Sequence, residues 1–274
     1  MYVSVAVMDT GIFRHMDFDT RIAGFADFVG RKKYLYDDNG HGTHVAGIIA
    51  GSGKGSNGKY RGIAPDTFLV SVKVLDKSGN GKIENVVEAA GWIIENKSAM
   101  NIRVVNISFG TRAKMENGPA IKTGEDDYAL IMAVEKMWDS GIVVVAAAGN
   151  NGPGNASVTA PGISKKIITV GAFDDKNFFS GRGPTRECIV KPEVVVTGSN
   201  IIACNNHQGR YSSKSGTSMA APVVSGAVAR LIKNNPDITP KEVKIWMKSC
   251  CKKINVPSEK QGWGVLDIRK FVTG

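Results

Sequence analysis

The sequence has no long hydrophobic run and no basic leader at its start. None of its uninterrupted apolar stretches approaches the roughly 20 residues that a membrane-spanning helix needs. Residues 1–8 run directly into Asp9 and are too few for the hydrophobic region and cleavage site of a signal peptide. We therefore expect a cytoplasmic protein with no membrane partner.

Cysteine is also scarce, with four residues in the chain. Cys188 and Cys204 stand alone, Cys250 and Cys251 are adjacent, and no Cys-x-x-Cys pair occurs. This spacing argues against a disulfide framework and against a structural zinc site, and it favours reduced thiols.

Glycine is plentiful at 32 residues, but it shows no three-residue period, which excludes a collagen-like chain.

The remaining composition is that of a folded domain with an excess of positive charge. The 274 residues are 42% hydrophobic and 22% charged, and 35 Lys and Arg against 25 Asp and Glu give a formal net charge of +10. A basic protein of this kind can bind nucleic acid. The basic residues are scattered, however, and their densest group, within 241–253, has the spacing of the solvent face of a helix. We therefore expect no nucleic-acid partner, and one domain over residues 1–274.

Short apolar segments rich in Val and Ile alternate with segments of helical periodicity. The first kind predicts strands buried on both faces of a sheet, at 2–8, 67–75, 102–108, 142–148 and 166–172. The second kind predicts helices at 42–51, 83–96, 127–140, 217–234, 239–251 and 266–272. Thr239 followed by Pro240 suits an N-cap and a first helical residue. The alternation predicts a single-domain α/β fold with a mostly parallel central β-sheet and helices on both faces.

Four polar residues lie where α/β proteins place their functional groups, at strand ends and helix starts. Asp9 follows the first predicted strand and Asn150 the fourth, each close to a glycine. His41 lies among glycines at a helix start, and Ser218 opens another helix, where free N–H groups favour negative charge. Taken singly, each has an ordinary interpretation as a turn, packing or capping residue. His41 and His44 could also bind a metal, although no third ligand is evident.

Together these segments resemble the subtilisin-like serine proteases, the subtilase family, and they occur in the family's order over most of the chain. The stretch 180–185 resembles the intracellular or alkaline-protease-like branch of that family. The matching motifs are Asp9-Thr10-Gly11, His41-Gly42-Thr43-His44-Val45-Ala46-Gly47, Ser108-Phe109-Gly110, Ala147-Ala148-Gly149-Asn150 and Gly216-Thr217-Ser218-Met219-Ala220-Ala221-Pro222.

The resemblance implies a role for each of the four polar residues. Ser218 would attack the scissile carbonyl, His41 would accept and return its proton, and Asp9 would orient the imidazole. The Asn150 side chain and the Ser218 N–H would form the oxyanion hole, and His44 would be a packing residue. This chemistry requires no cofactor and no metal. A catalytically silent relative that acts as a binding or regulatory module is the alternative, and the intact catalytic positions argue against it.

The resemblance also implies where a polypeptide substrate binds. An extended peptide would pair with two exposed stretches, one formed by Ser108, Phe109 and Gly110 and the other by Gly79, Asn80 and Gly81. Small neutral residues would wall the first pocket, namely Ser108–Gly110 on one side and Ala147, Ala148 and Gly149 on the other. No carboxylate is evident there, so we expect broad specificity with an apolar or aromatic preference before the cut.

The sequence departs from the family pattern in three places. Eight residues precede Asp9, so we expect little or no pro-region within this chain. The segment 52–62 contains no carboxylate, so we expect the calcium site found there in some secreted members to be missing, although another calcium site stays open. The segment 111–126 looks longer than the family minimum, and both a rim beside the first pocket and a tolerated insertion are consistent with it.

Overall fold

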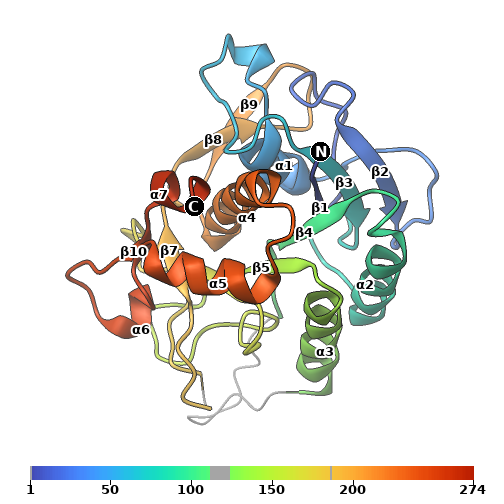
Figure 1. Cartoon of the computed structure of the whole chain (residues 1–274). Helices are drawn as coiled ribbons and strands as arrows, with labels where there is room; N and C mark the ends of the chain where they lie inside the picture. Colours follow the sequence, from blue (N-terminus) through green and yellow to red (C-terminus); the bar gives the residue numbers. More distant parts are fainter. Residues whose placement is uncertain (1, 112–123, 186) are drawn as a thin grey trace.

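A nine-stranded, mostly parallel sheet forms the centre of the computed structural model, which describes residues 2–111, 124–185 and 187–274 (Figure 1). Its strand order is β10-β11-β7-β6-β5-β4-β1-β3-β2, and β8 and β9 form a separate antiparallel pair. The strands are β1 (Ser4–Asp9), β2 (Ile22–Asp27), β3 (Phe68–Lys73), β4 (Ile102–Ile107), β5 (Val143–Ala147), β6 (Ile168–Ala172), β7 (Val194–Val196), β8 (Ile201–Cys204), β9 (Tyr211–Lys214), β10 (Cys251–Lys252) and β11 (Val265–Leu266).

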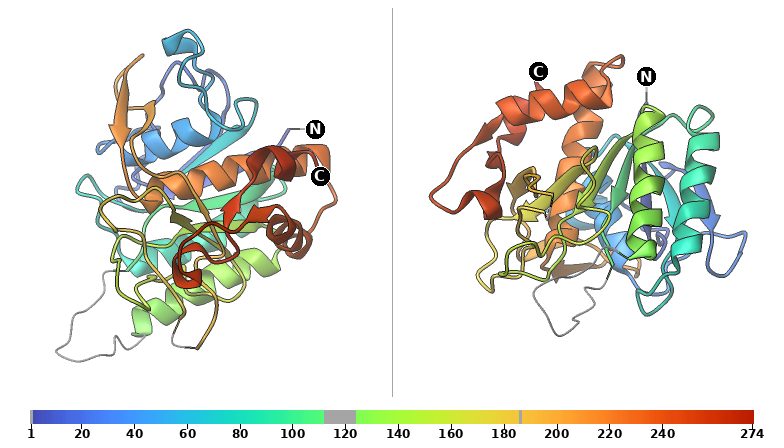
Figure 2. Two further views of the ribbon diagram at one scale, coloured as in Figure 1. Left: turned by 90° about the vertical axis from the view of Figure 1, so that its left-hand side faces the viewer. Right: turned by 90° about the horizontal axis from the view of Figure 1, so that it is seen from below.

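Helices cover both faces of this sheet (Figure 2). α2 and α3 pack on one face, and α1, α4, α5 and α7 pack on the other. The helices are α1 (His41–Ala50), α2 (Ile83–Asn96), α3 (Glu125–Asp139), α4 (Thr217–Asn234), α5 (Pro240–Ser249), α6 (Ser258–Gln261) and α7 (Ile268–Val272). No helix in these described ranges is both long enough and apolar enough to cross a membrane.

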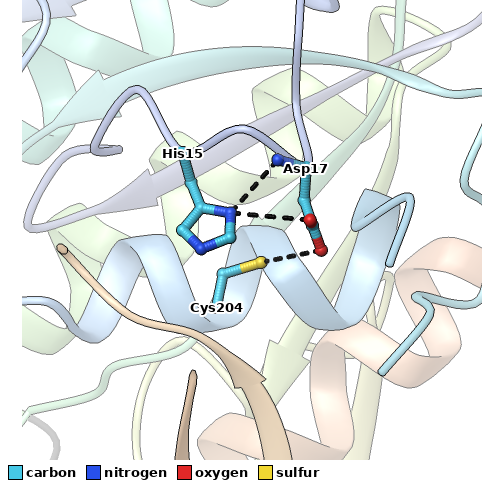
Figure 3. A group of neighbouring side chains, drawn as sticks. All are labelled: His15, Asp17 and Cys204. Carbon is cyan, nitrogen blue, oxygen red and sulfur yellow. Dashed lines mark hydrogen bonds and ion pairs between the residues drawn. The ribbon is translucent and has the colours of Figure 1, made fainter. Parts of the chain in front are cut away.

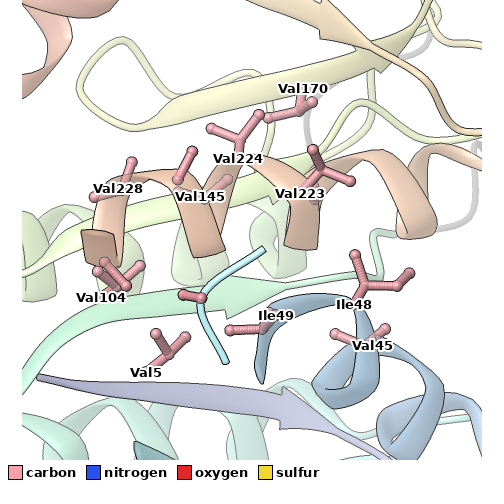
Figure 4. Close-up of a cluster of buried hydrophobic side chains, with 14 of the residues drawn as sticks. Val5, Val45, Ile48, Ile49, Val104, Val145, Val170, Val223, Val224 and Val228 are labelled. Carbon is pink, nitrogen blue, oxygen red and sulfur yellow. The ribbon is translucent and has the colours of Figure 1, made fainter. Parts of the chain in front are cut away.

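The central strands are apolar throughout because both of their faces are buried. In β1, Val5 and Val7 enter the core under α1 and α4, whereas Ala6 and Met8 enter the core under α2 and α3. Valines and isoleucines of α1 and α4 meet valines of β1, β4, β5 and β6 in the first of these cores (Figure 4). Burial of this kind stabilises the fold by about 25 cal/mol per Å² of apolar surface.

The strands and helices predicted from the sequence are present, and their boundaries shift by two residues or fewer. Thr239 accepts a hydrogen bond from the Glu242 backbone and caps α5, as predicted. The predicted helix at 266–272 is present as α7, which begins two residues later because Val265 and Leu266 form the short strand β11 and the Asp267 side chain caps the helix start. The predicted loop 111–126 lies, from 112 to 123, outside the described residues.

The strands that the sequence did not predict lie at edges or are very short. β2 is an edge strand whose residues are mostly half-exposed, and β9 is polar and partly exposed. Neither therefore carries the continuous apolar pattern of a central strand. The parallel pairing of β1, β4 and β5 places their carboxyl ends side by side at one edge of the sheet, and the candidate residues lie along this edge.

Candidate active site

Asp9 and His41 form a hydrogen-bonded pair at the carboxyl end of β1. Nδ1 of His41 lies 2.8 Å and 2.9 Å from the two carboxylate oxygens of Asp9. The Asp9 side chain is 1% exposed and that of His41 is 25% exposed, so the pair joins a buried acid to an imidazole that solvent can reach. A carboxylate accepts the proton on Nδ1, which leaves the lone pair of the neutral ring on Nε2.

Glycine allows the first turn of α1 to approach the end of β1 this closely. A Cβ atom at Gly42 would lie 2.1 Å from the carbonyl oxygen of Gly11 and 3.1 Å from Cβ of Asp9. Gly40, which precedes the helix, has a φ of +97°, a conformation that side chains disfavour. The glycines around His41 are therefore required for the contact between α1 and the Asp9 turn.

Asp37 is a buried carboxylate that joins the Asp9 turn to the start of α1. One of its oxygens accepts hydrogen bonds from the Thr10 hydroxyl at 2.9 Å and the Gly40 N–H at 2.8 Å. The other accepts from the backbone and the hydroxyl of Thr43, at 3.0 Å and 2.6 Å. The Thr10 hydroxyl in turn accepts from the N–H of Gly42 at 3.0 Å. Asp37 was not predicted from the sequence, although it stands four residues before His41.

The electrostatics of the two histidines of α1 differ. Burial by itself would lower the pKa of His41, but the negative charge of Asp9 and the hydrogen bond to it raise that pKa above 6.5. Burial lowers the pKa of His44 to about 4, and its Nε2 lies 2.9 Å from the carbonyl oxygen of Ser212. His44 is thus a buried packing residue, as predicted, and it does not contact Asp9. Within the described ranges it belongs to no group of three possible metal ligands.

Ser218 lies in the first turn of α4 and is joined to the segment after β4 by two hydrogen bonds. Its hydroxyl donates to the carbonyl oxygen of Ser108 at 2.8 Å, and the Ser108 hydroxyl donates to the Ser218 carbonyl oxygen at 3.0 Å. The Ser108 hydroxyl also accepts from the side chain of Asn106. The structure therefore places Ser218 at the expected edge of the sheet, with its hydroxyl directed to Ser108.

Asn150 follows β5 and is held by Thr217, the residue before Ser218. Its side-chain oxygen accepts from both the backbone N–H and the hydroxyl of Thr217, each at 3.0 Å. Because the oxygen is engaged in this way, the orientation of the amide is fixed and its NH₂ group points away from Thr217. The backbone N–H of Gly149 completes the arrangement by donating to the Thr217 hydroxyl at 3.1 Å.

The two stretches predicted to pair with substrate lie along one cleft. Gly79, Asn80 and Gly81 form an exposed turn, and they line the cleft together with Phe109 and Gly110. Asp76 holds the turn by accepting hydrogen bonds from the N–H groups of Ser78 and Asn80.

The predicted walls of the first pocket are partly built from buried residues. Ser108, Ala147 and Ala148 are almost fully buried, whereas Gly110 is exposed and Gly149 is half-exposed. The backbone N–H of Ala148 donates to Val170 and its carbonyl accepts from Thr159. Ala147 and Ala148 therefore support the wall from behind, and the side chain of Ser108 belongs to the Ser218 contact instead of the cleft.

Asp17 holds the segment 52–62, where the sequence predicted that a calcium site is missing. One carboxylate oxygen accepts from the N–H of Gly53 at 3.0 Å and the other from the N–H of Gly55 at 2.8 Å. The Tyr211 hydroxyl donates to the same carboxylate at 2.9 Å. These donors occupy the oxygens that a cation would need, so this segment does not fit a calcium ion.

His15, Asp17 and Cys204 form the one group of three possible metal ligands within the described ranges (Figure 3). Nδ1 of His15 accepts from the Asp17 N–H, and Nε2 lies 3.1 Å from the carbonyl oxygen of Arg210, to which it donates. Burial lowers the pKa of His15, and burial with the nearby charge of Asp17 raises the pKa of the Cys204 thiol. A neutral thiol and a ring with both nitrogens engaged indicate a structural hydrogen-bonded cluster.

Comparison with known proteins agrees with this geometry. The model of the subtilase family matches residues 2–264. The chain is 42% identical to the serine protease AprX of Bacillus subtilis over 90% of its own length, and it spans 60% of the length of AprX. It is 35% identical to subtilisin DY of Bacillus licheniformis, covering 88% of this chain and 81% of that protein.

A solved structure shows the same fold. The crystal structure of a cold adapted subtilisin-like serine proteinase superposes with a TM-score of 0.76 at 31% identity, covering 96% of this chain and 86% of the other. The range matched by the family model, residues 2–264, includes Asp9, His41, Asn150 and Ser218. The chain belongs to the subtilase family of serine peptidases.

Proposed function

We propose that this chain hydrolyses peptide bonds as a serine endopeptidase, with Asp9, His41 and Ser218 as the catalytic triad. One observation carries the proposal: a buried carboxylate fixes Nδ1 of His41 at the same sheet edge where Ser218 opens α4. Nε2 then carries the lone pair that can accept a proton from the Ser218 hydroxyl. The hydrogen-bonded pair of Asp9 and His41 argues against a catalytically silent relative that acts as a binding module.

The reaction would proceed through an acyl-enzyme. The Ser218 hydroxyl turns from the carbonyl of Ser108 towards His41, gives up its proton to Nε2 and attacks the scissile carbonyl carbon. His41 passes the proton to the leaving amine, and water then cleaves the acyl-enzyme by the same steps in reverse order. Asp9 stabilises the imidazolium that forms in between.

The negative oxygen of the tetrahedral intermediate would be bound by two donors. The fixed NH₂ group of Asn150 is one, and the backbone N–H of Ser218 is the other, because N–H groups in the first turn of a helix have no partner within that helix. The dipole of α4 adds a favourable contribution at the same end. No step requires a cofactor or a metal.

The substrate would be an extended polypeptide held between 79–81 and 108–110. Backbone pairing along two exposed stretches recognises a peptide with little regard to its sequence, so specificity would be broad. The residues predicted to wall the first pocket are uncharged, which supports an uncharged side chain before the cut.

A serine-directed fluorophosphonate probe tests this proposal. We expect the probe to label the wild-type chain at Ser218, and the chain to cleave a denatured protein at sites that mass spectrometry can map. Ser218→Ala should abolish both labelling and cleavage, whereas Ser213→Ala, at an exposed serine of β9, should leave both intact. Labelling that persists in Ser218→Ala would contradict the assignment of the nucleophile.

A further inference from the structure

We propose that Lys73 is a positioning residue whose buried ammonium group joins the turn that carries Asp9 to the substrate turn 79–81. Lys73 does not touch the reacting atoms, and it acts through the two backbone segments that it holds. The inference rests on the proposed peptidase function and extends it, because the catalytic pair and the substrate turn then depend on one side chain.

Lys73 is a charged residue at the end of a mostly apolar strand. It is the last residue of β3, it pairs in register with Asp9 of β1, and its side chain is 1% exposed. Burial of a charge is unfavourable unless hydrogen bonds and an opposite charge replace the lost water. The contacts of the ammonium group therefore decide whether Lys73 is tolerated at this position.

Three oxygens surround Nζ of Lys73, one for each proton of the ammonium group. Nζ donates to the carbonyl oxygens of Thr10, at 2.6 Å, and Leu75, at 2.9 Å. It also donates to a carboxylate oxygen of Asp38 at 2.7 Å, and it lies 4.8 Å from the centre of the Tyr36 ring. The ammonium group is therefore fully hydrogen-bonded, and it fixes the two carbonyl groups relative to each other.

The contact with Thr10 holds the turn that carries the catalytic carboxylate. The N–H of Thr10 donates to the side chain of Asp9 at 2.7 Å. The carbonyl oxygen of Asp9 accepts from the N–H of Leu75 at 3.2 Å. A shift of this turn would move the carboxylate that fixes Nδ1 of His41, so the geometry of the catalytic pair depends on the contact between Lys73 and Thr10.

The contact with Leu75 holds the start of the substrate turn. Asp76 follows directly, and its N–H donates to the carbonyl oxygen of Asn80 at 2.8 Å. A Cβ atom placed on Gly81 would lie 2.7 Å from the Leu75 side chain, so the end of the turn packs on its start. The position of Leu75 therefore sets the position of the substrate turn 79–81.

The contact with Asp38 supplies the opposite charge and does not join the two segments. The Asp38 side chain is 40% exposed, so water can solvate it when Lys73 is replaced. The carbonyl groups of Thr10 and Leu75 are buried, and they would lose this donor without a replacement from solvent. Removal of the ammonium group should therefore act on these two carbonyl groups.

Three variants test the inference. Lys73→Met keeps the length and most of the volume of the side chain and removes all three donors. Lys73→Arg keeps the charge and several donors, but a planar guanidinium does not match three oxygens placed around a tetrahedral ammonium group. Lys241→Met, at an exposed position of α5, is the control for the loss of one positive charge. Labelling by the fluorophosphonate probe, carried to completion, counts the active sites, and thermal unfolding shows that each variant is folded.

Two anilide substrates separate the two ends of the link. One has a single blocked residue before the scissile bond and is too short to pair along the substrate turn. The other is a peptide with several residues before that bond, whose extended backbone reaches the turn.

We expect Lys73→Met to lower kcat per labelled site by about 10- to 100-fold on both substrates, because a displacement of about 1 Å can lower a rate by about 10²-fold. It should also raise KM for the peptide and leave KM for the short substrate unchanged, because only the peptide uses the substrate turn. Lys73→Arg should show both changes by smaller factors, and Lys241→Met should show neither. If Lys73→Met does not fold, Lys73→Arg carries the test.

Unchanged kcat and KM in a labelled Lys73→Met variant would overturn the inference, since Lys73 would then contribute to stability alone. A lower kcat with an unchanged KM for the peptide, or the reverse, would show that Lys73 does not join the two segments. A Lys73→Arg variant less active than Lys73→Met would exclude the hydrogen bonds as the cause. Failure of the probe to label wild-type Ser218 is a different outcome, which would refute the proposed function itself.

Discussion

Replacing Asp9 by asparagine tests the catalytic pair most directly, because the two side chains have the same shape and differ in one hydrogen-bonding group. One oxygen of Asp9 accepts from the backbone N–H of Thr10 at 2.7 Å as well as from Nδ1 of His41. Among the described residues, the other oxygen contacts Nδ1 of His41 alone, at 2.9 Å. The amide of the asparagine must place an NH₂ group at one of these two positions.

Either orientation of the introduced amide disturbs the site. An NH₂ group facing Thr10 would place two donors together in a buried position. An NH₂ group facing His41 avoids this, but it forces Nδ1 to become the acceptor and moves the ring proton to Nε2, which can then no longer take a proton from Ser218. In serine proteases with this arrangement, the same substitution lowers kcat by a factor of about 10⁴. This factor corresponds to a loss of about 5.5 kcal/mol of transition-state stabilisation.

The pH profile gives a second readout with a definite sign. The charge of Asp9 raises the pKa of His41 above 6.5 against the opposing effect of burial. The acid limb of kcat/KM in the wild-type chain should therefore have its midpoint above pH 6.5, because only the neutral imidazole acts as a base. In Asp9→Asn the charge is lost and burial remains, so the residual activity should have its acid limb at lower pH.

The assay is kcat/KM on one peptide between pH 5 and 9, for the wild type, Asp9→Asn and the control Asp19→Asn at an exposed site. Thermal unfolding checks that Asp9→Asn remains folded. A loss of less than about tenfold, or an acid limb that stays in place or moves to higher pH, would refute the reasoning.

Two further predictions concern the oxyanion hole and the Asp17 contacts. Asn150→Ala should lower kcat by a factor of about 10²–10³ with little change in KM, which is the effect of removing the corresponding amide in subtilisin. An unchanged kcat would exclude the amide from the oxyanion hole. Asp17→Asn should lower the free energy of unfolding by about 2–4 kcal/mol, because its NH₂ group would face the N–H of Gly53 or Gly55. Asp19→Asn should cost less than about 1 kcal/mol in the same thermal denaturation, and equal losses would contradict the role of Asp17.

The central strands and the main helices could be predicted because local patterns report their burial. Valine and isoleucine runs mark strands covered on both faces, and the Thr239 cap with Pro240 marks a helix start. β2 and β9 could not be predicted in the same way, because an edge or exposed strand leaves no continuous apolar run. Their pairing depends on residues far away in the chain.

The order of most elements could be read from the sequence, because apolar runs and helical periodicity are local patterns. The four candidate catalytic residues came from the resemblance of the motifs, taken together and in order, to the subtilase family, since each residue taken singly has an ordinary interpretation. The surroundings of these residues follow from tertiary packing. Several contacts depend on residues that are distant in the sequence. Thr217 holds the Asn150 side chain, and the Ser218 hydroxyl donates to Ser108. Asp37 joins the Asp9 turn to the start of α1, and Thr159 lies close to both Gly110 and Gly149. Parallel pairing of β1, β4 and β5 creates most of them by bringing distant segments to one edge, a geometry that no local pattern encodes.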